Sequence, residues 1–195
     1  MKKIYNFAGN LSYRNYTIKD LFECKGKRKL SQINVKDEEE AYIALEGKVD
    51  LLITGLKSIK AVRSIVKNNF ITVAIPFTDF KTKDEILRAS LEALHNGADA
   101  IYTARSPSVV EYLARESIPV MAHLGLIPRK SIWIGGLRGV GKTASEAINL
   151  FQEFKTMESA GAFAVEAEVI AEQTLKYISE NVNLSSFSFS QKDKF

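Results

Sequence analysis

The sequence predicts an α/β protein with a parallel sheet, because strand-like and helix-like segments alternate along most of the chain. Short apolar runs, typical of strands buried on both faces, lie near residues 30–34, 50–54, 70–75, 100–103, 119–123 and 163–168, with a weaker candidate at 184–189. Segments with helical periodicity fill the gaps, and a short helix is expected near residues 17–24. Six or seven strand–helix units favour an incomplete (β/α)8 (TIM) barrel over a small nucleotide-binding sheet.

Helix ends and helix starts carry recognisable signals. Gly47, Gly97 and Gly161 each stand shortly before an apolar strand, so we expect each to end a helix in the left-handed conformation. Capping-box patterns, which predict helix starts, occur at 82–85, 108–111 and 143–146. The last opens an amphipathic helix, whose predicted apolar face carries Ala147, Ile148, Phe151, Phe154 and Met157.

Composition indicates an ordinary globular protein in the cytoplasm. Apolar residues make up 46% and charged residues 26%, and no apolar run is long enough to span a membrane. The only cysteine is Cys24, and the first residues are too polar for a secretory signal. The basic run at 25–29 reads as a solvated turn, so neither nucleic acid nor a membrane is an expected partner. We predict one domain over 1–195, with an N-terminal helix and entry segment over 1–28 and a weakly ordered tail over 185–195.

Residues 136–143 satisfy the G-x-x-x-x-G-K-T pattern of the phosphate-binding P-loop. The pattern follows the apolar run 132–134 and precedes a helix, as that motif requires. A P-loop domain also needs an apolar strand that ends in a magnesium-binding aspartate. The only acidic candidate downstream, 162–168, ends in glutamates. Nucleotide binding through this loop is therefore the least favoured of the candidate functions.

The segment 118–128, IPVMAHLGLIP, together with 135–138 and 141–143, resembles the ketopantoate (3-methyl-2-oxobutanoate) hydroxymethyltransferase family. Weaker similarity extends the resemblance over 15–184. It implies a barrel of the phosphoenolpyruvate mutase and isocitrate lyase type, ring-like homo-oligomers, and a G-K-T loop that binds no nucleotide. The implied reaction transfers a one-carbon unit from methylenetetrahydrofolate to 3-methyl-2-oxobutanoate, a small anionic 2-oxoacid, in pantothenate biosynthesis.

The resemblance also implies catalytic residues. His123 matches a histidine at the end of the fifth strand, and Glu168 matches a glutamate proposed as the general base. Strand alternation places Glu166 and Glu168 on one face, where a buried carboxylate pair would raise one pKa. In the alternative interpretation, His123 is only a hydrogen-bonded residue at a strand end, and Glu166 pairs with a lysine.

In the resembling family magnesium chelates the oxoacid, but its ligands do not recur here. Leu56 and Ala74 stand at the positions of two metal-binding aspartates. Tyr102 and Ala104 stand at those of a substrate-binding lysine and a glutamate near the metal. Asp79 is the only nearby substitute considered. Because magnesium needs oxygen ligands, we expect no metal at this site, and methylenetetrahydrofolate only if the protein is active.

Two basic residues lie beside the lost acidic positions. Lys57 and Arg105 suggest that fixed positive charge replaces a cation and binds an anionic ligand, with Tyr102 and Glu166 as further substrate-binding candidates. In the alternative interpretation, both basic residues are simply solvated.

Three functions follow from these observations: a one-carbon transferase, a non-catalytic paralogue that binds an anionic small molecule or a partner protein, and a nucleotide-binding protein. Residues after Leu184 do not match an eighth strand–helix unit. A barrel with seven strands leaves sheet edges to be covered, so we expect a homo-oligomer.

Overall fold

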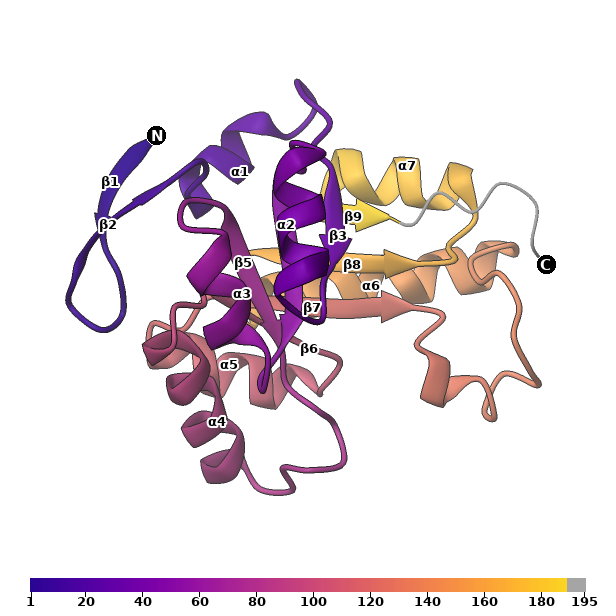
Figure 1. The fold of residues 1–195 in the computed structure, drawn as a ribbon. Coiled ribbons are helices and arrows are strands. Elements are labelled where there is room, and N and C mark those ends of the chain that lie inside the picture. The colour runs from indigo at the N-terminus through magenta and orange to yellow at the C-terminus, as the bar shows by residue number, and fades with distance from the viewer. Residues whose placement is uncertain (189–195) are drawn as a thin grey trace. The chain divides into compact units, whose positions relative to one another are not determined.

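The computed structural model describes residues 1–188 and divides the chain into two compact units. The first unit comprises residues 1–103 and 117–119, and the second comprises 104–116 and the chain from residue 120 onward (Figure 1). The predicted disordered end beyond Ser188 lies outside the described residues. No helix among residues 1–188 combines the length and apolar character needed to cross a bilayer.

The first unit contains an N-terminal hairpin and four parallel strands. The hairpin pairs β1 (Lys2–Tyr5) with β2 (Leu11–Arg14) and leads into α1 (Ile18–Cys24). The strands pair in the order β3 (Gln32–Asn34), β4 (Leu51–Gly55), β5 (Phe70–Ala74) and β6 (Ala100–Thr103). Between them run α2 (Glu38–Glu46), α3 (Ile59–Ile65) and α4 (Lys83–His95).

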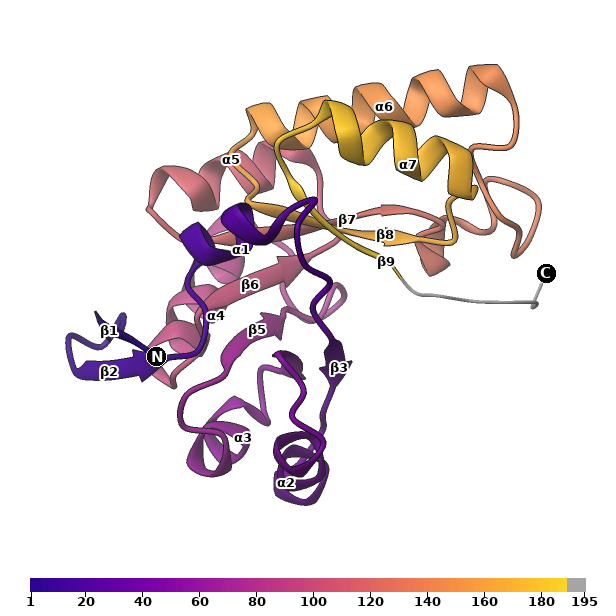
Figure 2. The ribbon, with the colours of Figure 1, turned by 90° about the horizontal axis from the view of Figure 1, so that it is seen from above.

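The second unit contains three parallel strands and three helices. The strands pair in the order β7 (Val120–Gly125), β8 (Ala164–Glu168) and β9 (Ser185–Ser188). The helices are α5 (Pro107–Arg115), α6 (Ala144–Ser159) and α7 (Glu172–Asn181), and a 3-10 turn η1 (Pro128–Lys130) follows β7. Figure 2 shows α6 and α7 side by side along one face of these strands.

The predicted fold class is confirmed, because parallel strands alternate with helices in both units, as in part of a TIM barrel. Each of the seven predicted strands is present within two residues of its expected bounds. Continuous apolar runs were a reliable signal because β4, β5 and β7 are buried along nearly their whole length. The hairpin β1–β2 was not predicted, since its strands are only four residues long and mostly exposed.

The helix-end predictions hold with corrections. Gly97 and Gly161 adopt positive φ angles of 104° and 89°, as expected. Gly47 does not: its φ is −70°, and Lys48 takes the left-handed position at φ 54°. Gly47 caps α2 in a right-handed conformation, with its amide donating to the carbonyl of Ile43, so the reversal comes one residue later.

Of the three predicted capping boxes, only the one at 82–85 forms with both of its hydrogen bonds. Thr82 and Glu85 form the reciprocal box, and an unpredicted box joins Thr17 to Asp20. Thr143 accepts from the amide of Glu146, but the Glu146 carboxylate bonds elsewhere. The box at 108–111 was wrong, because Pro107 already occupies the first turn of α5, where its fixed φ suits a helix start.

The predicted apolar face of α6 is partly wrong. Phe154 and Met157 are buried, but Ile148 is 60% exposed. Leu150 is buried in its place, so the packed face of α6 includes positions 150, 154 and 157. These three positions follow the four- and three-residue spacing of a helix face that packs on a sheet.

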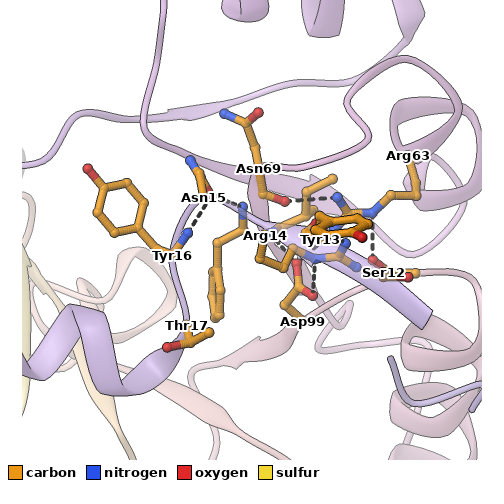
Figure 3. Close-up of polar contacts among 12 residues, drawn as sticks. Ser12, Tyr13, Arg14, Asn15, Tyr16, Thr17, Arg63, Asn69 and Asp99 are labelled. Carbon is orange, nitrogen blue, oxygen red and sulfur yellow. Dashed lines mark hydrogen bonds and ion pairs between the residues drawn. The ribbon is translucent and has the colours of Figure 1, made fainter. Parts of the chain in front are cut away.

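A buried cluster of charges joins distant parts of the first unit (Figure 3). The Asp99 carboxylate, just before β6, accepts from Arg14 Nε at 2.6 Å, Arg63 Nη2 at 2.7 Å and the Ile71 amide at 2.9 Å. The Arg14 side chain is only 3% exposed, and burial lowers the pKa of Arg63 to about 10. Asp99 thereby holds the hairpin, α3 and two strands together.

We expect Asp99→Ala to lower the free energy of unfolding by about 3–5 kcal/mol, because it leaves two buried guanidinium groups without their carboxylate. Urea denaturation measures this loss. Glu111→Ala is the control, since it removes only the exposed pair with Arg115 and should cost less than about 1 kcal/mol. Equal losses in the two variants would contradict a stabilising role for the cluster.

Candidate functional site

The candidate catalytic residues meet on neighbouring strands of the second unit. The parallel register of β7 and β8 sets His123 opposite Glu166 and Gly125 opposite Glu168. His123 Nε2 and Glu168 Oε2 lie 2.7 Å apart, within hydrogen-bond distance. Glu166 and Glu168 share one face of β8, as strand alternation predicted. His123 and Glu166 are buried, whereas the Glu168 side chain is partly exposed.

The surroundings of this pair fix its protonation. Burial, together with the positive charges of Arg129 and Lys130, lowers the pKa of His123 to about 4. The imidazole is therefore neutral at pH 7, and when the Glu168 carboxylate is ionised it only accepts, so the imidazole then donates its Nε2 proton. Burial raises the pKa of Glu168, and the negative charge of Glu166 adds to this increase. Glu168 thus has the raised basicity of a general base.

Strained backbone holds Glu168 in place. The next residue, Val169, has a φ of 47°, which is unusual for a β-branched residue. The carbonyl oxygen of Glu168 accepts from the Leu126 amide at 2.7 Å, and that of Val169 accepts from the Val140 amide at 3.0 Å. Such conformations persist where neighbouring bonds enforce them, and they are frequent at functional sites.

Gly125 permits the close approach of β7 to the end of β8. Its φ is 91°, and a Cβ atom there would lie 2.2 Å from the Glu168 carbonyl oxygen. Because that oxygen belongs to the backbone, no side-chain rotation relieves the clash. Any side chain at position 125 therefore displaces the segment that carries Glu168.

The G-K-T loop binds its own residues. The Lys142 amide donates to Glu146 Oε2 at 3.0 Å, and Arg138 Nη2 donates to Glu146 Oε1 at 2.7 Å. The Glu146 carboxylate thus occupies a backbone amide of the kind that a P-loop offers to phosphate. The apolar run before the loop forms turns instead of a strand, with Ile132 84% and Trp133 86% exposed. Through the Val140 amide, the loop supports the end of β8.

Two basic residues that the sequence analysis missed lie near the His123–Glu168 pair. Arg129 and Lys130 belong to η1, just after β7, and their charges act on His123. The Arg129 guanidinium donates through Nη2 to the carbonyl oxygen of Ala104, which follows β6. Their position after the carboxyl end of a strand was the available signal, because barrel enzymes concentrate their chemistry there.

The other predicted site residues divide between the two units. Lys57 is exposed and Tyr102 is half-buried in the first unit. Arg105 is half-buried in the second unit, where burial lowers its pKa. Joint ligand binding by Lys57 and Arg105 therefore stays a prediction.

The residues at the carboxyl edge of β4–β6 do not fit magnesium. Gly55, Ala74 and Tyr102 are direct neighbours in the register, and none carries a carboxylate. Asp79 is exposed and accepts from the Thr78 hydroxyl at 3.2 Å. Residues 1–188 contain no group of three or more acidic, His or Cys side chains placed to hold a metal ion. Magnesium bound by protein usually has at least one carboxylate ligand.

Comparisons with known proteins agree with this architecture. A family model described as ketopantoate hydroxymethyltransferase matches residues 54–189. A 3-methyl-2-oxobutanoate hydroxymethyltransferase from Pyrococcus abyssi is 27% identical over 196 residues, covering 88% of this chain and 70% of that relative.

Solved structures show the same fold at low identity. A 2,3-dimethylmalate lyase, described as a PEP mutase/isocitrate lyase superfamily member, aligns with a TM-score of 0.62 and 10% identity, covering 95% of this chain and 78% of that one. A phosphonopyruvate hydrolase in complex with oxalate and Mg++ aligns with a TM-score of 0.60 and 10% identity, covering 89% and 80%. The resemblance in the sequence is thereby confirmed at the level of the family, and the solved structures show that the fold is shared.

We expect the ring protons of His123 to titrate near pH 4 in an NMR experiment, with His123→Gln used for assignment. An unfolded histidine titrates near pH 6.5, so the unfolded chain takes up this proton first as the pH falls. His123 therefore lowers stability as the pH falls from about 6.5 to about 4. A midpoint near 6.5 in the folded protein would contradict a buried, neutral imidazole.

We expect Gly125→Ala to destabilise the protein more than Gly135→Ala does, as measured by urea denaturation. Both glycines have positive φ, but a Cβ at Gly135 meets no atom within 4 Å. The control should cost about 1–2 kcal/mol from backbone strain alone. The clash with the Glu168 backbone should add about 1–3 kcal/mol at Gly125. Similar losses would show that the strand ends adjust freely.

Proposed function

Because the chain belongs to the ketopantoate hydroxymethyltransferase family, we propose that it binds a small 2-oxoacid beside Glu168 and removes a proton from the carbon next to the oxo group. The observation that carries this proposal is the 2.7 Å contact between His123 and the Glu168 carboxylate, whose pKa is raised. By family resemblance, the substrate is 3-methyl-2-oxobutanoate and methylenetetrahydrofolate supplies the one-carbon unit.

In this proposal Glu168 is the general base and His123 orients it. Oε2 accepts the Nε2 proton of the neutral imidazole, so the substrate proton goes to Oε1. Burial and the neighbouring Glu166 charge both favour the neutral carboxyl that results. The proton transfer therefore relieves an electrostatic penalty in the protein while negative charge develops on the substrate oxygen.

The proposal routes no step through a metal ion. A related fold binds Mg++ with oxalate, but the strand ends Gly55, Ala74 and Tyr102 offer no carboxylate for one here. The oxoacid must then be held by protein groups. The basic residues of the second unit are the natural candidates, since an anionic ligand needs positive charge in a partly buried site.

A second candidate function is a non-catalytic family member that binds an anionic small molecule. The carboxylate-free edge of β4–β6 favours it, because the family chemistry depends on polarising the oxo group. The two candidates share the ligand class and differ only in whether a proton leaves the ligand.

We expect the protein to exchange the C3 proton of 3-methyl-2-oxobutanoate in deuterated water, followed by NMR. Glu168→Gln should slow the exchange by roughly 10²–10⁴-fold, because the base is removed. Glu172→Gln, in the first turn of α7, is the control and should exchange at the normal rate.

The outcomes separate the candidates. Oxoacid binding without exchange, with magnesium present or absent, would favour the non-catalytic member. Absence of oxoacid binding would reject the proposed activity and any non-catalytic role that depends on binding the oxoacid. Full exchange in Glu168→Gln would reject Glu168 as the base.

A further inference from the structure

The N-terminal hairpin is packed on one face and exposes an apolar surface on the other. In the register of β1 and β2, Lys3 lies opposite Tyr13 and Tyr5 lies opposite Leu11, so these four side chains share one face. Tyr5 is 76% exposed, Leu11 50% and Tyr13 47%. Arg14 belongs to the other face, where it is buried against Asp99. A two-stranded hairpin is marginally stable by itself, so a second layer on the exposed face would stabilise it.

The exposed hairpin face, defined by Lys3, Tyr5, Leu11 and Tyr13, carries positive charge. No aspartate or glutamate precedes Asp20 in the sequence, and Lys3 lies within the face itself. The same face of a second copy would bring like charge against it, whereas an acidic and apolar surface would match it in both respects. The two lysines of β1 also disfavour pairing through the edge of that strand.

Helix α2 presents an acidic and apolar surface of this kind. Its buried residues are Ala41 and Ala44, whereas Tyr42 is 56% exposed and Ile43 61%. A surface helix usually buries its large apolar side chains, so α2 has the reverse arrangement. Its outer stripe consists of four exposed side chains at the three- and four-residue spacing of one helix face: Glu39, Tyr42, Ile43 and Glu46. The two glutamates lie at the two ends of this stripe.

We propose that the exposed hairpin face of one copy of this chain packs on the outer stripe of α2 of a second copy. The contact buries the hairpin aromatics against Tyr42 and Ile43 and brings Lys3 to the acidic stripe. Both surfaces belong to the first unit, and each copy offers both of them. The contact is therefore head to tail and repeats from copy to copy, as a ring or a chain. The inference is independent of the proposed activity.

Analytical ultracentrifugation of the full chain tests the proposal. We expect the unchanged protein to assemble, and Tyr5→Ser or Ile43→Ser to weaken the association at least roughly tenfold, because each removes a large apolar side chain from the contact. Lys3→Glu should weaken it more than Lys3→Gln does, since the reversed charge meets glutamates. Leu91→Ser is the matched control: Leu91 is 50% exposed on α4 of the same unit, and this variant should assemble normally.

A mixing experiment distinguishes a head-to-tail contact from a symmetric one. Tyr5→Ser keeps an intact α2 stripe, and Ile43→Ser keeps an intact hairpin face. An equimolar mixture of the two variants should therefore form pairs that neither variant forms alone. If Tyr5→Ser changes the circular dichroism spectrum, Leu11→Ser replaces it in the mixture, because it removes a different side chain from the same face.

Several results would overturn the inference. A monomeric unchanged protein would do so, as would full assembly of either Tyr5→Ser or Ile43→Ser. Loss of assembly in the hairpin variant alone would indicate that two hairpins meet each other instead. Loss in both variants without recovery in the mixture would show that these two surfaces do not form one contact. A loss in Leu91→Ser equal to that in Ile43→Ser would indicate a nonspecific effect of removing exposed apolar side chains.

Discussion

The site depends on how closely β7 approaches the end of β8. Gly125 lies so near the Glu168 carbonyl oxygen that only a residue without Cβ fits, and Leu126 then donates its amide to that oxygen. In the same register, His123 lies opposite Glu166, and the His123 ring is within hydrogen-bond distance of Glu168. The strained Val169 and the G-K-T loop, through Val140, complete the support. A phosphate-loop pattern is thus used to hold a strand end.

Charge explains why these few residues belong together. His123 is kept neutral by burial and by two nearby cations, and Glu168 is made more basic by burial and by Glu166. A neutral donor orients the base without neutralising its charge, as an imidazolium would. The carboxyl edge of β4–β6, in the first unit, carries glycine, alanine and tyrosine and no carboxylate. An edge without a carboxylate lacks the oxygen ligands that magnesium usually takes from protein.

The sequence predicts the repeated part of the fold well and the local exceptions poorly. The strands around Leu52, Ile71 and Val165 were predictable because burial on both faces leaves apolar residues little choice. The hairpin β1–β2 is held at its end by Arg14 and Asp99, which are 85 residues apart, and no local pattern contains that contact. Likewise, the resemblance identified His123 and Glu168, but the reach of Arg129 to Ala104 depends on the path of the chain after β7. The sequence alone does not predict contacts between strand ends, because these depend on the register of the strands.

Two carboxylates, the buried Asp99 and the partly exposed Glu168, differ in a way that separates stability from chemistry. Asp99 is surrounded by Arg14, Arg63 and a backbone amide, so its charge is compensated and its environment resembles that of a structural ion cluster. Glu168 has a neutral imidazole and a second carboxylate as neighbours, which leaves its charge undercompensated. Selection for stability alone favours the first arrangement, since each unpaired buried charge costs free energy. The arrangement around Glu168 is reasonable where a carboxylate must accept a proton. Protonation removes a charge whose burial costs free energy.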